Sequence, residues 1–163
     1  FVLVGSGNPE EGELRPQLLD RFGLSVEVRS PQDVAERVEV NKLRDAFESD
    51  FDAFMARHQA DDAQIRDQNL KARKRLPKIK TPDSVLEDCA ALCIALGSDG
   101  LRGELTLLRT ARALAAYDGA RSVTRDHLRA IAPSALSHRL RRDPLDEAGS
   151  GARVARICTE VLG

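Results

Sequence analysis

Apolar residues recur at helical spacing through most of the chain. Positions three or four residues apart predict helices in the last half, over residues 85–96, 101–117, 125–132, 134–141 and 152–162. The segments between these helices are short, which is typical of a helical bundle. We expect residues 81–163 to form one all-helical unit.

A long helical region is predicted before this bundle. Ser30 is the expected N-cap, with Pro31 at the first helical position and Asp33 as a capping partner. A charged tract follows over residues 57–75, and Pro77 closes it. The tract ends in a basic run at residues 71–80, which we interpret as a solvated helix face or a hinge, because no aromatic residue interleaves the charges as in a nucleic-acid patch.

The beginning of the chain has a different pattern. Residues 1–5 are apolar without alternation, which predicts a strand buried on both faces of a parallel sheet, and residues 24–28 predict a second strand. Two strands do not make a stable parallel sheet, so we expect that residues before Phe1 carry the rest of an α/β core. Between the strands, Pro16 and Gly23 mark the first turn and the exit of a short helix.

Charge and cysteine content narrow the classes of protein to which this chain could belong. Lys and Arg number 25 against 26 Asp and Glu, so a net charge of −1 provides no chain-wide field that attracts nucleic acid or an anionic membrane. No apolar run approaches the roughly 18 residues that span a bilayer. Cys89, Cys93 and Cys158 are an odd number in apolar surroundings, which argues against a disulfide framework. We expect a soluble, cytoplasmic protein, or one of the plastid stroma if the source is a plant.

Three polar residues are candidates for chemistry. Asn8 follows the first strand, where it could orient a water molecule or only stabilise its own turn. Arg21 ends the short helix, where its guanidinium could neutralise phosphate on a neighbouring molecule or pair with Asp20. Arg102 begins a helix, a place unfavourable for a cation, so either an anionic ligand or an ion pair with Glu104 would explain it.

The sequence gives little support for a metal site or for a phosphate-binding loop. Cys89 and Cys93 are one helical turn apart, but their apolar neighbours indicate a core helix rather than a zinc site. The sequence contains no G-x-x-x-x-G-K-[ST] motif, so it lacks the phosphate-binding loop that an ATPase needs.

Three segments together carry a resemblance to a known family. Residues 1–24 resemble the second half of an AAA+ ATPase core, residues 100–116 its sensor-2 helix, and residues 123–128 with 139–145 its helical domain. More narrowly, the chain is similar to the ATPase I subunits of magnesium chelatase. The implied fold is the C-terminal part of an α/β P-loop AAA+ core in residues 1–30, a helical insertion in 31–80 and an all-helical lid in 81–163, so that the chain is mostly α.

The resemblance also implies roles for the three candidates. Asn8 matches sensor 1, which positions the attacking water or senses the γ-phosphate, and Arg21 matches the arginine finger, which acts in trans on the neighbouring subunit. Arg102 matches the sensor-2 arginine. The implied cofactors are ATP and Mg²⁺, with most of their ligands upstream of residue 1.

The implied activity is that of magnesium chelatase, EC 6.6.1.1. ATP hydrolysis in a homo-oligomeric ring, expected to be a hexamer, would drive insertion of Mg²⁺ into protoporphyrin IX for chlorophyll or bacteriochlorophyll synthesis. Implied partners are the chelatase D subunit and, transiently, the porphyrin-binding H subunit, with no nucleic acid and no membrane span. The alternatives are a MoxR-type chaperone ATPase and a non-catalytic helical adaptor; the helix of residues 102–112 favours the chelatase over MoxR.

Overall fold

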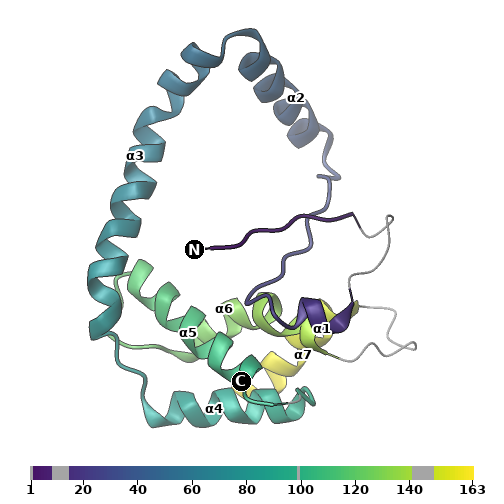
Figure 1. The fold of residues 1–163 in the computed structure, drawn as a ribbon, viewed down its shortest axis with the longest axis vertical. Coiled ribbons are helices and arrows are strands. Elements are labelled where there is room, and N and C mark those ends of the chain that lie inside the picture. Colours follow the sequence, from purple (N-terminus) through teal and green to yellow (C-terminus); the bar gives the residue numbers. More distant parts are fainter. Residues whose placement is uncertain (1, 9–14, 99, 141–148) are drawn as a thin grey trace.

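The C-terminal half of the chain is a bundle of four helices. The computed structural model describes residues 2–8, 15–98, 100–140 and 149–163. In it α4 (Asp83–Ala95), α5 (Arg102–Tyr117), α6 (Arg125–Leu136) and α7 (Gly149–Leu162) pack together (Figure 1). The short 3₁₀ helix η3 (Ser137–Arg139) extends α6. This arrangement confirms the expected all-helical unit.

The core of the bundle is aliphatic. On α5, the residues Gly103, Leu107, Ala111 and Ala115 lie four positions apart and are all buried. The helix therefore packs against its neighbours through a narrow face on which three of these four residues are small. Other fully buried positions come from each of the remaining helices: Leu92 on α4, Leu128, Ala132 and Leu136 on α6, and Val154 on α7. No Phe or Tyr belongs to the core among the described residues.

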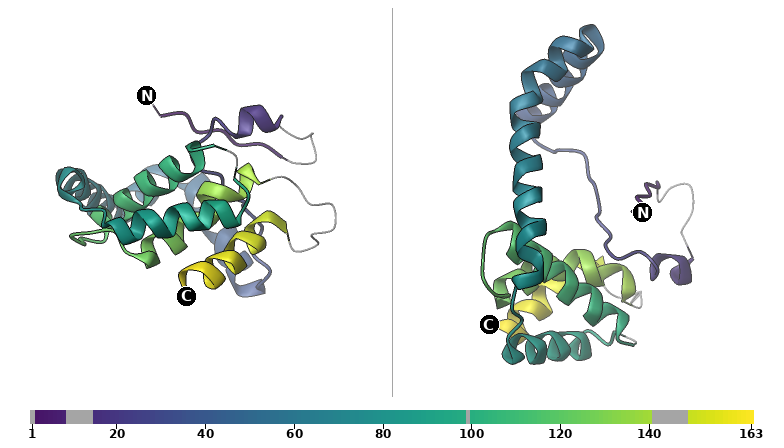
Figure 2. Two further views of the ribbon diagram at one scale, coloured as in Figure 1. Left: turned by 90° about the horizontal axis from the view of Figure 1, so that it is seen from below. Right: turned by 60° about the vertical axis from the view of Figure 1, so that its left-hand side comes forward.

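A long helical arm leaves the bundle. It consists of α2 (Val34–Ser49) and α3 (Phe51–Arg75), and Figure 2 shows it projecting well beyond the other helices. None of the described residues of α2 is buried, and on α3 only Ala72, near the bundle, is buried. The arm is therefore held at its base, where α3 packs against α5. None of the described helices combines the length and the apolar character needed to cross a bilayer.

The two arm helices meet at Asp50. This residue ends α2 and is the N-cap of α3, where its carboxylate accepts a hydrogen bond of 2.9 Å from the Ala53 amide. Around it, the Phe47 ring makes edge-to-face contacts with Phe51 and Phe54, at centroid distances of 5.2 and 5.5 Å. A cap and a small aromatic cluster thus set the turn at the tip of the arm.

Two expected helix boundaries are wrong. Helix α2 begins after Asp33 rather than Ser30, because Asp33 has extended backbone angles and its side chain accepts from the Glu36 amide. Pro133 was expected to end a helix and lies inside α6 instead. The helix continues because Ala135 and Leu136, both fully buried, gain more from packing than the proline costs. The separate helix expected at residues 134–141 is therefore the end of α6 with η3, and residue 141 lies outside the described part.

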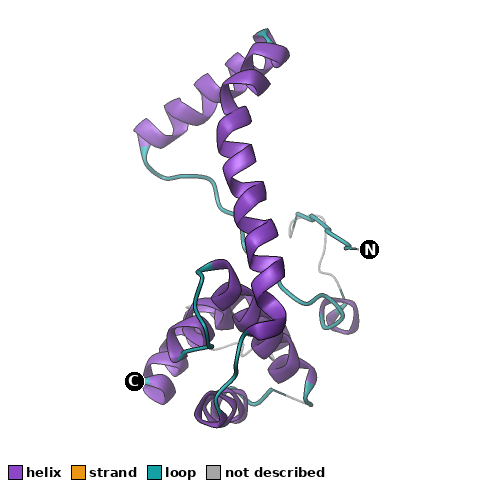
Figure 3. Ribbon diagram, turned by 90° about the vertical axis from the view of Figure 1, so that its left-hand side faces the viewer, coloured by secondary structure: helices purple, strands orange, loops and turns teal. Residues whose placement is uncertain are grey.

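The two expected strands are not formed. Residues 2–8 and 24–30 have no strand structure, Val2, Val4 and Val28 are strongly exposed, and Figure 3 shows these segments as loops. The reason is that a strand needs a neighbour for its backbone hydrogen bonds, and the described residues supply no sheet. The short helix α1 (Pro16–Leu19) forms as predicted, followed by a turn to Gly23.

We predict that Gly103→Ala destabilises the bundle by about 1–3 kcal/mol, the usual cost of overpacking a core. A Cβ at this position would lie 2.9 Å from Ser98 Oγ and 3.2 Å from Leu136 Cδ2. The matched control is Gly151→Ala on α7, where a Cβ meets nothing within 4 Å and should add about 0.5–1 kcal/mol of helix stability. Urea unfolding of both variants tests this, and a Gly103→Ala variant as stable as the parent would contradict it.

Candidate functional site

The turn after α1 is bound to the helical bundle through Asp20. Its carboxylate accepts a hydrogen bond of 2.6 Å from Arg102 Nη1, at the start of α5, and another from Arg139 Nη1, in η3. Two guanidinium groups from separate elements of the bundle therefore converge on one carboxylate. The sequence separation of 82 and 119 residues explains why spacing alone did not predict the pairs.

Arg139 is the buried member of this junction. Its side chain is only 4% exposed and uses its three nitrogens on four acceptors. Nη1 bonds the carboxylate and, at 2.7 Å, the carbonyl of Asp20, Nη2 donates to the Phe22 carbonyl at 2.7 Å, and Nε donates to the Ala135 carbonyl at 3.0 Å. A buried guanidinium is tolerated because it is both hydrogen-bonded and charge-compensated.

His138 and Ser134 add two further attachments. His138 Nε2 donates to the Phe22 carbonyl at 3.2 Å, and the Ser25 amide donates to the Ser134 carbonyl at 2.8 Å. Burial, aided by the Arg139 charge, lowers the pKa of His138 despite the opposing effects of the Phe22 carbonyl and Asp20. Its other ring nitrogen, Nδ1, is buried without a hydrogen-bond partner, so a proton there would be unsatisfied.

Arg21 lies immediately beside this junction but takes no part in it. The residue is exposed, and its guanidinium makes no hydrogen bond or ion pair with any described residue. The expected alternative, pairing with Asp20, is not seen, because Asp20 is bound to Arg102 and Arg139. The junction thus holds the backbone of residues 20–22 while leaving the Arg21 charge available to another molecule.

Arg102 is where the sequence placed it, in the first turn of α5, but not with the expected partner. It pairs with Asp20 rather than with Glu104, which is on its own helix. The pair is solvent-accessible, with side chains 58% and 46% exposed, so an anionic ligand can compete for Arg102. The structure therefore brings Arg102 close to the Arg21 segment.

The segment that contains Asn8 approaches this junction at Gly5, where a Cβ would lie 3.7 Å from the Phe22 ring. Asn8 itself is exposed, and its side chain has interactions of its own. Residues 9–14, between Asn8 and α1, lie outside the described residues.

The sequence did not single out Asp20, His138 or Arg139 as a unit. The only feature of the sequence that could have indicated this junction is the pair of polar residues at positions 138 and 139, after Leu136. That pair does not reveal that its partners, Phe22 and Asp20, lie more than 100 residues away. The turn at residues 142–144 lies outside the described residues.

Two guanidinium groups at this junction are accessible to an anion. An exposed, unpaired guanidinium on Arg21 and a displaceable one on Arg102 both suit phosphate oxygens. Within residues 2–8, 15–98, 100–140 and 149–163, no three or more His, Cys, Asp or Glu side chains are grouped to hold a metal ion. The three cysteines of the described chain are buried free thiols.

Comparison with known proteins supports the resemblance. Residues 86–157 match the AAA lid domain family. The chain is 72% identical, over 99% of its length, to the magnesium-chelatase 38 kDa subunit of Cereibacter sphaeroides and covers 48% of that protein. It is 51% identical, over its whole length, to the subunit of the same name from Chlorobaculum tepidum and covers 42% of it. The chain thus spans about half the length of the curated relatives it matches.

The fold has a counterpart among solved structures. A crystal structure from Cytophaga hutchinsonii, described as an ATPase, matches with a TM-score of 0.66 over 92% of this chain and 49% of that chain. At 15% identity the match concerns the fold alone.

We predict that Arg139→Met loosens residues 20–25 from the bundle, because the carbonyl of Phe22 and the carboxylate of Asp20 lose their buried donor. The expected cost is about 2 kcal/mol, which equals a roughly 30-fold loss of hydrogen-exchange protection at the Ser25 amide. Arg102→Met, the exposed partner of the same carboxylate, should cost less than about 1 kcal/mol. Equal effects of the two substitutions would contradict the assigned roles.

We predict that the folded state loses stability below pH 6.5 in part through His138. Its pKa is lower in the folded chain than the ordinary value of 6.5, so the unfolded chain binds more protons and is favoured as the pH falls through that range. The urea midpoint should therefore fall further between pH 7.5 and 5.5 in the parent than in His138→Gln. Parallel decreases in both chains would show that His138 does not contribute.

Proposed function

We propose that the chain belongs to the magnesium-chelatase 38 kDa subunit family of AAA+ ATPases and that it carries the arginine finger and the sensor-2 lid of a ring-forming ATPase. In this proposal, ATP hydrolysis by the ring drives insertion of Mg²⁺ into protoporphyrin IX. The relatives bear the chelatase name, and the matching lid family supports the ATPase class.

The observation that carries the proposal is the state of Arg21. Its guanidinium is exposed and unpaired among the described residues, while the backbone on either side is bound to the bundle by Arg139 and His138. A residue that stabilises charge on a neighbouring subunit's nucleotide needs both properties. Phosphoryl transfer is catalysed mainly by positioning and charge neutralisation, which a fixed arginine supplies without covalent chemistry.

Arg102 is proposed to report the nucleotide state to the lid. It begins α5, the helix that supplies much of the core of the bundle, and its exposed bond to Asp20 can be exchanged for a bond to phosphate. Because Asp20 also binds Arg139, such an exchange changes the charge balance at a point where the Arg21 turn joins the lid. The proposed consequence is that nucleotide binding and lid position are linked.

The remaining roles are proposed from the family. Asn8 would orient the attacking water or sense the γ-phosphate, and ATP with Mg²⁺ would be held mostly by residues outside this chain. The assembled form would be a homo-oligomeric ring, expected to be a hexamer, acting with the D subunit and transiently with the porphyrin-binding H subunit. A cytoplasmic location is proposed on the same basis.

We predict that Arg21→Ala, made in the ring-forming protein, lowers ATP turnover by about 10³-fold or more, the usual range for an arginine finger, with little change in nucleotide affinity. The matched control is Arg29→Ala, which removes an exposed arginine whose partner is only the nearby Glu27. Steady-state hydrolysis and the binding of a fluorescent nucleotide are the two measurements. Normal turnover of Arg21→Ala would remove Arg21 from the site.

The substrate of the whole complex is tested separately. Addition of the porphyrin-binding and D subunits should yield Mg²⁺-porphyrin only with the parent ring, as followed by fluorescence. An active ATPase that supports no metal insertion with these subunits would favour the MoxR-type alternative.

A further inference from the structure

Acidic residues are concentrated at one end of α3 and basic residues at its other end. Residues 45–52, at the tip of the arm, contain four acidic residues and no basic one; we call Asp45, Glu48, Asp50 and Asp52 the acidic tip. Residues 71–80, at the base, contain six basic residues and no acidic one. The arm is thus a rod with a negative end and a positive end.

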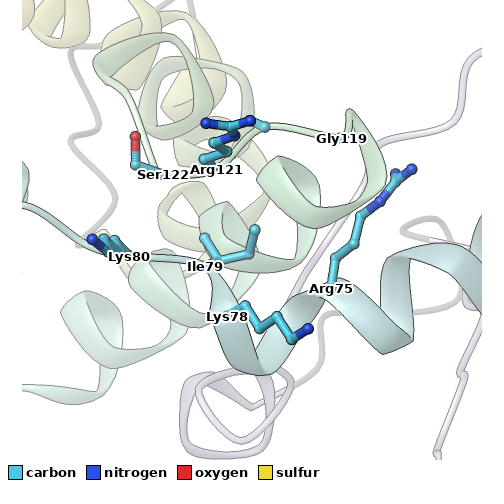
Figure 4. Close-up of a pocket in the computed structure, with 8 residues that line it drawn as sticks. Arg75, Lys78, Ile79, Lys80, Gly119, Arg121 and Ser122 are labelled. Atoms are coloured by element: carbon cyan, nitrogen blue, oxygen red, sulfur yellow. The ribbon is translucent and has the colours of Figure 1, made fainter.

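At the base, four cations surround one cavity, which we call the basic basin. It has a volume of about 500 Å³ and lies between the end of α3 and the loop joining α5 to α6. Its cationic lining residues are Arg75, Lys78, Lys80 and Arg121, and its lining contains no acidic residue (Figure 4).

Backbone pairing joins the two sides of the basic basin. The Lys80 amide donates to the Arg121 carbonyl at 3.1 Å, and the Val123 amide donates to the Lys80 carbonyl at 2.9 Å. Ile79 is turned into the core, which leaves Lys78 and Lys80 on its two sides facing solvent. Two segments about 40 residues apart in sequence thereby contribute charge to one surface.

The cations of the basic basin lack acidic partners within the described chain. None of the four forms an ion pair there; Arg75 only donates a long hydrogen bond of 3.4 Å to the Ala116 carbonyl. Some arginines elsewhere on the bundle are paired, as Arg125 is with Asp88 at 2.6 Å and Arg129 with Asp126 at 2.7 Å. The basic basin is therefore an uncompensated positive surface.

The acidic tip is compensated only in part. Asp45 and Asp52 form no ion pair with any described residue, while Glu48 pairs with Arg44 and Asp50 caps α3. Phe51, between them, is 54% exposed. The acidic tip therefore offers separate carboxylates and an apolar ring on one convex turn.

A single chain cannot bring its own acidic tip to its own basic basin. The 25 residues of α3 separate them by about 37 Å of continuous helix. We propose that the acidic tip of one copy docks on the basic basin of the next copy, as a head-to-tail contact repeated around the assembly. The inference rests on the ring put forward above as the proposed function.

The geometry favours a second copy over a small free anion. The ends of Lys78, Lys80, Arg75 and Arg121 point in different directions around the basic basin instead of converging on one point (Figure 4). Several carboxylates carried on one turn can each reach a different cation, which a single phosphate cannot. Complementary charge of this kind contributes chiefly to orientation and to the rate of association.

Site-directed cross-linking tests the contact directly. Ser49 ends α2 beside the acidic tip and Ser122 lines the basic basin, whereas the native cysteines are buried. A mixture of Ser49→Cys and Ser122→Cys subunits, assembled with ATP and treated with a short bis-maleimide, should give a cross-linked dimer. Ser49→Cys mixed with Ser30→Cys, an exposed position away from the basic basin, should give at least about tenfold less.

Charge reversal identifies the cause of the cross-link. Asp45→Lys with Asp52→Lys, or Lys78→Glu with Arg121→Glu, should each lower the yield by about tenfold, corresponding to about 1.4 kcal/mol. The four substitutions combined in one chain should restore it, because the charges are then exchanged. Loss without restoration would overturn the proposed contact.

The remaining outcomes separate this inference from the proposed function. A ring that assembles and hydrolyses ATP without a cross-link between positions 49 and 122 would overturn the docking contact and leave the ATPase intact. Pyrophosphate binding that is abolished by Lys78→Glu with Arg121→Glu, in the absence of the cross-link, would overturn it in favour of a free-anion site. A protein that neither assembles nor hydrolyses ATP would overturn both proposals.

Discussion

The buried guanidinium of Arg139 joins the two parts of this molecule. Among the described residues it makes three hydrogen bonds to the turn after α1, more than any other residue of the bundle, and it is almost completely removed from water. A cation in such a place must be compensated, and the Asp20 carboxylate provides the compensation. The position of the adjacent Arg21, and hence any role for it on a neighbouring molecule, depends on this pair.

The arm is stabilised in a different way from the bundle. The bundle buries an aliphatic core from four helices, whereas among the described arm residues only Ala72 is buried and the two helices meet chiefly at the tip. With few buried contacts, local opening of α2 should cost much less than unfolding of the bundle. This property suits a segment whose apolar and charged residues are available to other molecules.

Local spacing placed Arg102 and Arg21 on their elements but did not predict the observed ion pairs, and the roles of both arginines stay predictions. The position of Arg102 at a helix start, and that of Arg21 at the end of a short helix, could be inferred from local signals. The alternatives considered for them, Glu104 and Asp20, are near in sequence, whereas the observed partner of Arg102 is 82 residues away. Asp20 is bound instead to Arg102 and Arg139, and this leaves Arg21 unpaired among the described residues. Local spacing carries no information on contacts at such separations.

The apolar pattern alone predicts the helical bundle, because residues three and four positions apart share one face of a helix and leave water when that face packs against another element. The cap at Thr124 is likewise local, since Thr124 and His127 are three residues apart, whereas the turn at Asp50 lies inside a stretch predicted as one long helical region. Tertiary packing instead explains why Pro133 remains helical, because burial of the following residues outweighs a local preference. It likewise decided that the basic residues 75, 78, 80 and 121 share one cavity, because that requires pairing of segments that are distant in the chain.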